Sequence, residues 1–175
     1  MNVCVYGAAS DLIDDVFKNA GIELGKKLVD NGHNLVFGGG DGGMMGAVHK
    51  GVKMNGGKSY GIAPTWMQGF EGLVEDVDGF IYTKSMSERK DLFVKYSDAF
   101  IISPGGLGTM DEFFEILTLK KLDQNKCPVI LFNINHIYDE LIKFMDIMVE
   151  NELIPSSKSN LFEVAITVDE VIGYL

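Results

Sequence analysis

The sequence predicts one α/β domain over residues 1–175, a Rossmann-like, doubly wound parallel sheet of about seven strands with helices on both faces. Short apolar runs of β type alternate along the chain with segments of helix length, and glycine-bearing turns follow three of these runs. Strands of a parallel sheet are buried on both faces, so they read as short, continuous apolar runs. A chain of 175 residues is also long enough to enclose one sizeable core.

The first half of the chain is predicted to hold four strands and two helices. The helix over Asp14–Asn31 has the clearest pattern, because an apolar residue recurs once per turn and Gly32 ends the repeat. A second helix covers Gly43–Asn55. The stretch Pro64–Asp78 has no clear periodicity and is the best candidate for a mobile or substrate-contacting loop. The strands predicted in this half are Val3–Tyr6, Leu35–Phe37, Ser59–Ile62 and Phe80–Tyr82.

The second half is predicted to continue the alternation. Its strands are Ala99–Ile102, Val129–Phe132 and Val164–Val168. Its helices are Glu88–Tyr96, Met110–Leu122, Ile137–Glu150 and Asp169–Tyr174. Ligands of such sheets bind beyond the carboxyl ends of the strands, where the strand order reverses. Three glycine-bearing turns fall at strand ends, at Gly7, Gly38–Gly40 and Gly105–Gly108, and we expect them to converge on one crevice.

The charge and composition of the chain exclude several classes of protein. The formal net charge is −10. Sequence-independent binding of nucleic acid requires a basic surface, so we predict no nucleic-acid partner. No apolar run approaches the roughly 18 residues of a membrane helix, so we predict no membrane partner. The first residues, MNVCVYG, show no basic region before the apolar ones, and we expect no signal peptide and a cytoplasmic location.

The cysteines and histidines indicate neither disulfide bonds nor a metal. Cys4 and Cys127 each lie in or beside a predicted strand and are interpreted as reduced core thiols. The histidines are scattered, and no group of Cys and His has the spacing of metal ligands, so we predict no metal site.

The segment Pro104–Glu112, PGGLGTMDE, is the strongest candidate for a functional site. It joins a predicted strand to a predicted helix through a glycine turn, which lets backbone N–H groups and the helix N-terminus face an anion such as phosphate. A loop that only gripped phosphate would gain nothing from the carboxylate of Glu112, which we place in the first helical turn and expect to be ionised. The segment therefore suggests that a phosphorylated molecule is chemically altered here.

A second glycine pattern, Gly38, Gly40 and Gly43, has the G-x-G-x-x-G spacing of dinucleotide sites. That fingerprint also needs an acidic residue about 20 positions later, and the window Ser59–Gly69 contains neither Asp nor Glu. We interpret the turn as a second phosphate or ribose cradle, with NAD binding and a purely structural turn as the alternatives. No G-x-x-x-x-G-K-[ST] motif of P-loop nucleotidases is present.

The segment Met86–Lys90, MSERK, begins a predicted helix with Ser87 as its N-cap. Arg89 then falls in the first turn, where the helix dipole disfavours a cation, which suggests an anionic partner. Asp111 could serve the site or only complement the dipole of its helix, and Glu115 could support the site or be solvated.

Together these three motifs resemble the Lonely Guy family of phosphoribohydrolases, which release cytokinin bases from their riboside 5′-monophosphates and were often labelled lysine decarboxylase. PGGLGTMDE is similar to its P-G-G-x-G-T-x-x-E signature, MSERK to M-x-x-R-K, and FGGGDGGMMG to Y-G-G-G-x-x-G-L-M-G. The family spaces its Arg and Glu by 23 residues, and here 112 − 89 = 23.

The resemblance implies a set of site residues. Arg89 and Glu112 match the catalytic pair. The remaining positions, implied to bind substrate or its phosphate, are Gly39, Gly40, Met86, Lys90, Gly105, Gly106, Leu107, Gly108 and Thr109. No cofactor is implied. A homodimer is implied, and Met110–Leu122 is more apolar than one helix face can bury, so we expect it and Glu88–Tyr96 to form the interface.

The implied reaction is hydrolysis of the N-glycosidic bond of a purine riboside 5′-monophosphate, either AMP or an N6-substituted AMP, to free base and ribose 5-phosphate. A carboxylate near C1′ can stabilise the positive charge that builds on the sugar as the bond breaks. Departures from the family pattern at Gly7–Ser10, Phe37 and Thr65 leave base specificity open. Within the unpatterned loop, Trp66, Met67 and Phe70 are candidates to shape the base pocket, with core packing as the alternative for Trp66.

Three other functions compete with this one. The same fold could hold a nucleotide as a non-catalytic sensor, although holding AMP does not require a carboxylate near the sugar. A true lysine decarboxylase would need pyridoxal phosphate and a suitably framed lysine, which the chain lacks. An N-glycosidase acting on other nucleotides is the third.

Overall fold

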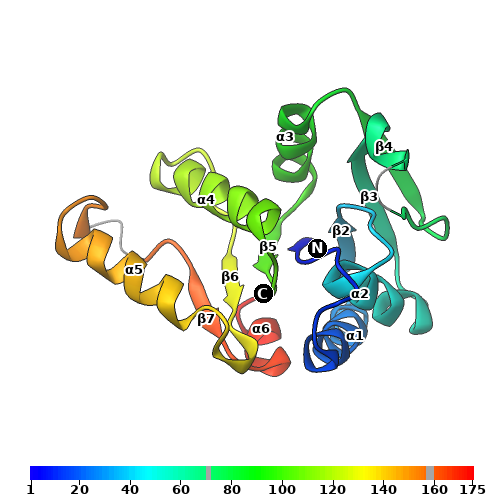
Figure 1. Cartoon of the computed structure of the whole chain (residues 1–175), viewed down its shortest axis with the longest axis horizontal. Helices are drawn as coiled ribbons and strands as arrows, with labels where there is room; N and C mark the ends of the chain where they lie inside the picture. Colours follow the sequence, from blue (N-terminus) through cyan, green and yellow to red (C-terminus); the bar gives the residue numbers. More distant parts are fainter. Residues whose placement is uncertain (70–71, 157–159) are drawn as a thin grey trace.

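The computed structural model describes residues 1–69, 72–156 and 160–175 and confirms the α/β class. Seven parallel strands form one sheet in the order β4-β3-β2-β1-β5-β6-β7 (Figure 1). The strands are β1 (Asn2–Tyr6), β2 (Asn34–Phe37), β3 (Ser59–Pro64), β4 (Gly79–Thr83), β5 (Ala99–Ile102), β6 (Val129–Phe132) and β7 (Glu163–Ala165).

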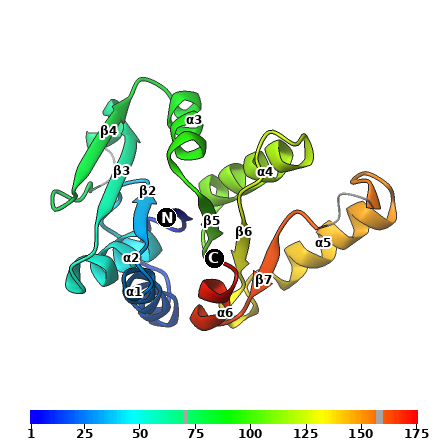
Figure 2. The same ribbon diagram turned by 180° about the vertical axis from the view of Figure 1, so that it is seen from behind.

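Helices cover both faces of the sheet, which makes it doubly wound (Figures 1 and 2). The helices are α1 (Asp15–Asp30), α2 (Gly43–Met54), α3 (Met86–Tyr96), α4 (Leu107–Lys121), α5 (Asp139–Glu150) and α6 (Val168–Gly173), with short 3-10 turns at Thr65–Gly69 and Ile134–His136. Alternate residues of β1 face two separate cores: Val3 and Val5 pack with α1, α2 and α6, and Cys4 and Tyr6 pack with α3, α4 and α5. This division explains the continuous apolar runs of the strands.

The predicted elements are all present, but five of the six predicted helix starts differ from the structure by one to three residues, and three of these differences have a local explanation. The N-cap of α3 is Ser85, whose Oγ accepts from the Glu88 amide at 3.1 Å, so Ser87 does not cap this helix. The start of α4 is Leu107, three residues before the predicted start at Met110, because the chain enters the helix directly from the glycine turn. The helix α6 begins at Val168 and is capped by Thr167. The preceding strand therefore ends earlier than predicted, at Ala165.

The order of the strands reverses between β1 and β5, and the turns that follow these two strands are bonded to each other. The Ser103 hydroxyl donates to the Tyr6 carbonyl at 2.5 Å, and the Ala8 amide donates to the Pro104 carbonyl at 2.9 Å. A Cβ on Gly7 would lie 2.4 Å from the Ser103 Oγ, so only glycine allows this approach. The two turns therefore form one continuous rim at the reversal point, where ligands of such sheets bind.

Candidate active site

A pocket of about 340 Å³ opens at this reversal point. It is bounded by the turns after β1 and β5, by the first turns of α2 and α3, and by the 3-10 turn after β3. Its lining residues are Gly7, Ala8, Ala9, Ser10, Met45, Met67, Met86, Arg89, Gly106, Gly108, Thr109 and Glu112. The structure thus brings Arg89, Glu112, Met86 and three residues of the glycine turn together in one cavity.

The side chains of Arg89 and Glu112 form a buried ion pair on one wall of this pocket. The Arg89 Nη1 donates to the Glu112 Oε1 at 3.0 Å, and the two residues are only 7% and 8% exposed. Figures 1 and 2 both show α3 and α4, which carry the pair, side by side above β5. The anionic partner that we predicted for Arg89 is therefore Glu112.

The guanidinium of Arg89 is held from three further directions. Its Nε donates to the Ile62 carbonyl at the end of β3 at 3.0 Å. The Phe93 ring lies 4.9 Å from the guanidinium carbon, within the range of a cation–π contact. A Cβ on Gly38 would lie 2.3 Å from the Arg89 Nη2, so glycine at the end of β2 leaves the space that the guanidinium fills. These contacts fix the position of the guanidinium that pairs with the Glu112 carboxylate.

The carboxyl group of Glu112 is not kept ionised by a helix dipole, contrary to the sequence-based expectation. Because α4 begins at Leu107, Glu112 lies in its second turn, beyond the region where the dipole acts strongly. Burial raises the pKa of Glu112 to about 7, and the nearby carboxylates of Asp111 and Glu115 act in the same direction. Arg89 and Lys90 oppose the rise. A carboxyl group with a pKa near neutrality can both accept and return a proton at physiological pH.

The ammonium group of Lys90 lies outside the pocket lining and pairs with two carboxylates of α4. Its Nζ lies 3.2 Å from Asp111 and contacts Glu115 at close range, and these ion pairs raise the pKa of Lys90, with the hydrogen bond to Glu115 as the largest cause. Asp111 therefore pairs with Lys90 instead of complementing the start of α4, and Glu115 is not free in solvent. Lys90 acts on the site through charge, next to Glu112.

The N-terminus of α4 opens into the pocket. Gly106 is the N-cap and carries no side chain to bond the first amides of the helix, and Gly106, Gly108 and Thr109 all line the cavity. The first N–H groups of a helix have no partner within it, so this end can bind an anion. The side chain of Leu107 is 92% exposed, which leaves only its backbone for such a role. The amide of Gly105 is bonded elsewhere, to the Tyr138 hydroxyl at 3.0 Å.

The N-terminus of α2, in contrast, is closed by its own chain. The Gly43 amide donates to the Asp11 carboxylate at 2.8 Å, and the amides of Met44 and Met45 both donate to the Ala8 carbonyl. The second phosphate cradle predicted from G-x-G-x-x-G is therefore a turn whose helix amides are used within the fold. Gly39 and Gly40 are outside the pocket lining; they pair with Val74 and Leu73, and their contact with a nucleotide stays a prediction.

The pocket contains residues that sequence reasoning did not single out. Met45 at the start of α2 lines it without having been named individually, and the turn Ala8–Ser10 also lines it, although the sequence analysis noted that turn only as a departure from the family pattern. Met67 lines the pocket, as considered for the unpatterned loop, whereas Trp66 is 56% exposed and is neither core nor lining. Phe70 lies outside the described residues.

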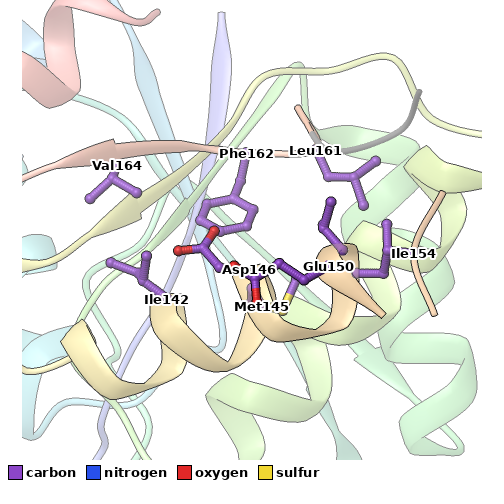
Figure 3. A pocket seen from close by; sticks show the side chains of 9 residues that line it. Ile142, Met145, Asp146, Glu150, Ile154, Leu161, Phe162 and Val164 are labelled. Carbon is purple, nitrogen blue, oxygen red and sulfur yellow. The ribbon is translucent and has the colours of Figure 1, made fainter. Parts of the chain in front are cut away.

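A larger hollow of about 410 Å³ lies between α5 and β7 (Figure 3). Its walls are aliphatic and aromatic side chains such as Ile142, Leu161 and Phe162, and its ionisable lining groups are the carboxylates Asp146 and Glu150. Two carboxylates repel a phosphate, so this hollow does not suit a phosphorylated ligand.

Within residues 1–69, 72–156 and 160–175, no group of three or more His, Cys, Asp or Glu side chains could hold a metal ion. Among the same residues no helix is long and apolar enough to cross a membrane.

Comparison with known proteins decides the family. The family model described as "Possible lysine decarboxylase" matches residues 45–175. A rice protein named probable cytokinin riboside 5′-monophosphate phosphoribohydrolase LOGL9 is 39% identical over 160 residues, which are 91% of this chain and 70% of that protein. The chain belongs to the Lonely Guy family. The resemblance seen in the three motifs is thereby confirmed, and membership makes the chain an enzyme of the phosphoribohydrolase class.

Other relatives in the Lonely Guy family align over nearly the whole chain. The Arabidopsis thaliana enzyme named cytokinin riboside 5′-monophosphate phosphoribohydrolase LOG3 is 34% identical over 99% of this chain and 80% of its own length. Solved structures show the same fold at lower identity. The molybdenum cofactor binding protein of Rippkaea orientalis superposes with a TM-score of 0.73 at 24% identity, covering 98% of this chain and 93% of that one. A structure described as TM1055 gives a TM-score of 0.75 at 21% identity, covering 98% and 96%.

Proposed function

We propose that this Lonely Guy family member hydrolyses the N-glycosidic bond of AMP or an N6-substituted AMP, giving the free base and ribose 5-phosphate. One observation carries the proposal: the open N-terminus of α4 and the buried Arg89–Glu112 pair face the same pocket. The first suits a phosphate, and the second suits a sugar carbon that gains positive charge. The names of the relatives supply the substrate class, since they act on cytokinin riboside 5′-monophosphates.

In the proposed reaction the phosphate binds the amides at the start of α4, and this remote contact places the glycosidic bond next to Glu112. The carboxylate of Glu112 stabilises the positive charge on the sugar and takes a proton from the attacking water, and the departing base takes its proton from solvent water, so that the two proton transfers balance. Arg89 keeps that carboxylate oriented through the 3.0 Å contact. Asp111 is paired with Lys90 and does not line the pocket, so it is a poor source of the proton for the departing base.

The pocket lining also suits a base. Met45, Met67 and Met86 surround the cavity, and thioether side chains are flexible and polarisable enough to pack against purines with different N6 groups. The binding-only alternative would use the same cavity, but it gives no role to a buried carboxyl group beside the sugar position.

The test is release of adenine from AMP, followed by chromatography, with adenosine as the matched substrate that lacks phosphate. We expect release from AMP and much slower release from adenosine. Binding of AMP without release would favour the sensor function, and equal rates on AMP and adenosine would remove the α4 N-terminus from the mechanism. A panel of N6-substituted and other nucleotides then separates this activity from that of an N-glycosidase for other substrates.

We further propose that the chain acts as a homodimer through α3 and α4. Of the apolar residues that suggested this, Phe113, Ile116 and Leu117 are buried in the core of the chain itself. The remaining argument is the outer face of α4, where Phe114 is 38% exposed and Leu122 is 59% exposed. Light scattering at micromolar concentration should give twice the chain mass, and Phe114→Asp should reduce it to one chain mass; a monomer in the unaltered protein would contradict the proposal.

A further inference from the structure

The hydroxyl of Tyr138 is inserted into the loop that leads from β5 to α4. It donates to the Ser103 carbonyl at 2.8 Å and accepts from the Gly105 amide at 3.0 Å. Tyr138 comes from a distant part of the chain, just before α5, and is only 6% exposed. Its hydroxyl thus bonds two backbone groups on either side of Pro104, directly before the anion-binding turn.

The short turn before α5 holds Tyr138 in position through hydrogen bonds of a buried asparagine. The buried Asn133 accepts from the Tyr138 amide through Oδ1 at 2.7 Å and donates through Nδ2 to Asp139 at 2.7 Å. Between them, Asn135 and His136 have φ values of 54° and 59°. The left-handed region is uncommon for residues other than glycine, although Asn and His adopt it more readily than most, so two such residues in succession mark a sharp turn.

The contacts of the hydroxyl separate its role from that of the ring. The ring packs in the core shared by α3, α4 and α5, which phenylalanine would fill equally well. The hydroxyl, in contrast, both donates and accepts a hydrogen bond within the loop between Ser103 and Gly105. Burial raises the pKa of Tyr138 to about 12, so the hydroxyl stays a donor at any physiological pH.

We propose that Tyr138 is a positioning residue for phosphate recognition: its hydroxyl fixes Ser103–Gly105 so that the amides of Gly106–Thr109 face the pocket. The proposal rests on the proposed function, because it takes the start of α4 as the phosphate site. Tyr138 itself does not line the pocket. The expected consequence is a loss of affinity for phosphate-bearing ligands alone.

The experiment compares Tyr138→Phe with the unaltered chain by titration calorimetry, using two probes that the enzyme does not consume. Ribose 5-phosphate reports the phosphate site, and adenine reports the base site. We expect the affinity for ribose 5-phosphate to fall about three- to tenfold, as for loss of one or two hydrogen bonds, and the affinity for adenine to stay unchanged. With AMP as substrate, KM should rise by the same factor while kcat changes little. The matched control is Tyr174→Phe, which removes a hydroxyl from a side chain that is 43% exposed, outside the site.

A folded Tyr138→Phe variant that binds ribose 5-phosphate as the unaltered chain does would overturn the proposal, as would an equal loss for both probes. If Tyr138→Phe fails to fold, Asp139→Ala provides the test, because it releases Asn133 and should weaken the same probe while sparing adenine; no change there would also overturn it. Failure of the proposed function is seen separately, in the unaltered chain, as no release of adenine from AMP.

Discussion

The guanidinium of Arg89 and the carboxylate of Glu112 meet at 3.0 Å in a buried position, although 23 residues separate them along the chain. Their helices leave the carboxyl ends of β4 and β5, which lie on opposite sides of β1 in the sheet. The pair therefore bridges the two halves of the sheet across the reversal point.

Glu112→Gln should abolish most of the turnover while the chain stays folded. The amide keeps the shape of the carboxylate but carries no charge and accepts no proton, so kcat for AMP should fall by roughly 10²-fold or more. Asp111→Asn is the matched control, because Asp111 is exposed and points to Lys90; it should have a milder effect. Adenine release measured by chromatography decides the matter, and a fully active Glu112→Gln variant would remove Glu112 from the mechanism.

The same residue should make stability depend on pH. Its carboxyl pKa is raised from 4.5 to about 7 in the folded chain, so the folded state binds more protons than the unfolded state between these values. The contribution to stability is fully present below pH 4.5 and is lost as the pH rises through about 7. Relative to the unaltered protein, Glu112→Gln should therefore gain up to about 3 kcal/mol in unfolding free energy between pH 4.5 and 8. Urea denaturation at a series of pH values measures this difference, and a difference independent of pH would show that the group is not shifted.

Lys90→Gln should move the pH dependence of the reaction without blocking the pocket. Its positive charge opposes the rise in the pKa of Glu112 and neutralises Asp111 and Glu115, so its removal should raise that pKa further. The acid limb of kcat/KM for AMP should shift to higher pH, and the rate at the alkaline plateau should be nearly retained. Lys126→Gln, on the loop before β6, serves as the control. A uniform loss at every pH would instead indicate that Lys90 contacts the substrate.

Met67→Ala should change the preference between substrates, because Met67 lines the pocket from the loop after β3. The space it leaves should lower kcat/KM for AMP by about threefold or more and lower it less for an AMP with a bulky N6 group. Trp66→Ala is the neighbouring control and should leave the ratio unchanged, because its side chain is exposed and lies outside the pocket lining. An altered ratio in Trp66→Ala with none in Met67→Ala would reverse the assignment.

The sequence allowed the fold to be predicted from local signals, whereas the pairing of Arg89 with Glu112 was predicted from the resemblance to the Lonely Guy family. The runs Ala99–Ile102 and Val129–Phe132 are apolar throughout and lie in the middle of a covered sheet, as their composition indicated. Arg89 stood out because its position disfavoured a cation, and the carboxylate that explains it is Glu112.

The features that were missed depend on contacts between distant segments. Asp11 closes the start of α2, which no pattern within G-x-G-x-x-G could reveal. The pKa of Glu112 is raised by burial, and the dipole of α4 acts little on this carboxyl group because the helix begins at Leu107. Lys90 was grouped with the ligand-binding residues through the resemblance of MSERK to the family's M-x-x-R-K element, yet its side chain pairs with Asp111 and Glu115 of α4 outside the pocket lining.

Because the Tyr138 hydroxyl is bonded to Ser103 and Gly105, a loop within the PGGLGTMDE signature is tied to a residue that lies outside it. A fragment ending after α4 would contain every residue of that signature, together with Arg89, and would still lack the side chain that ties Ser103 to Gly105. Transplanting the nine-residue loop into another parallel sheet would meet the same obstacle unless a hydroxyl were supplied from the next crossover. The residues that shape this site thus extend beyond the motif into the segment between β6 and α5.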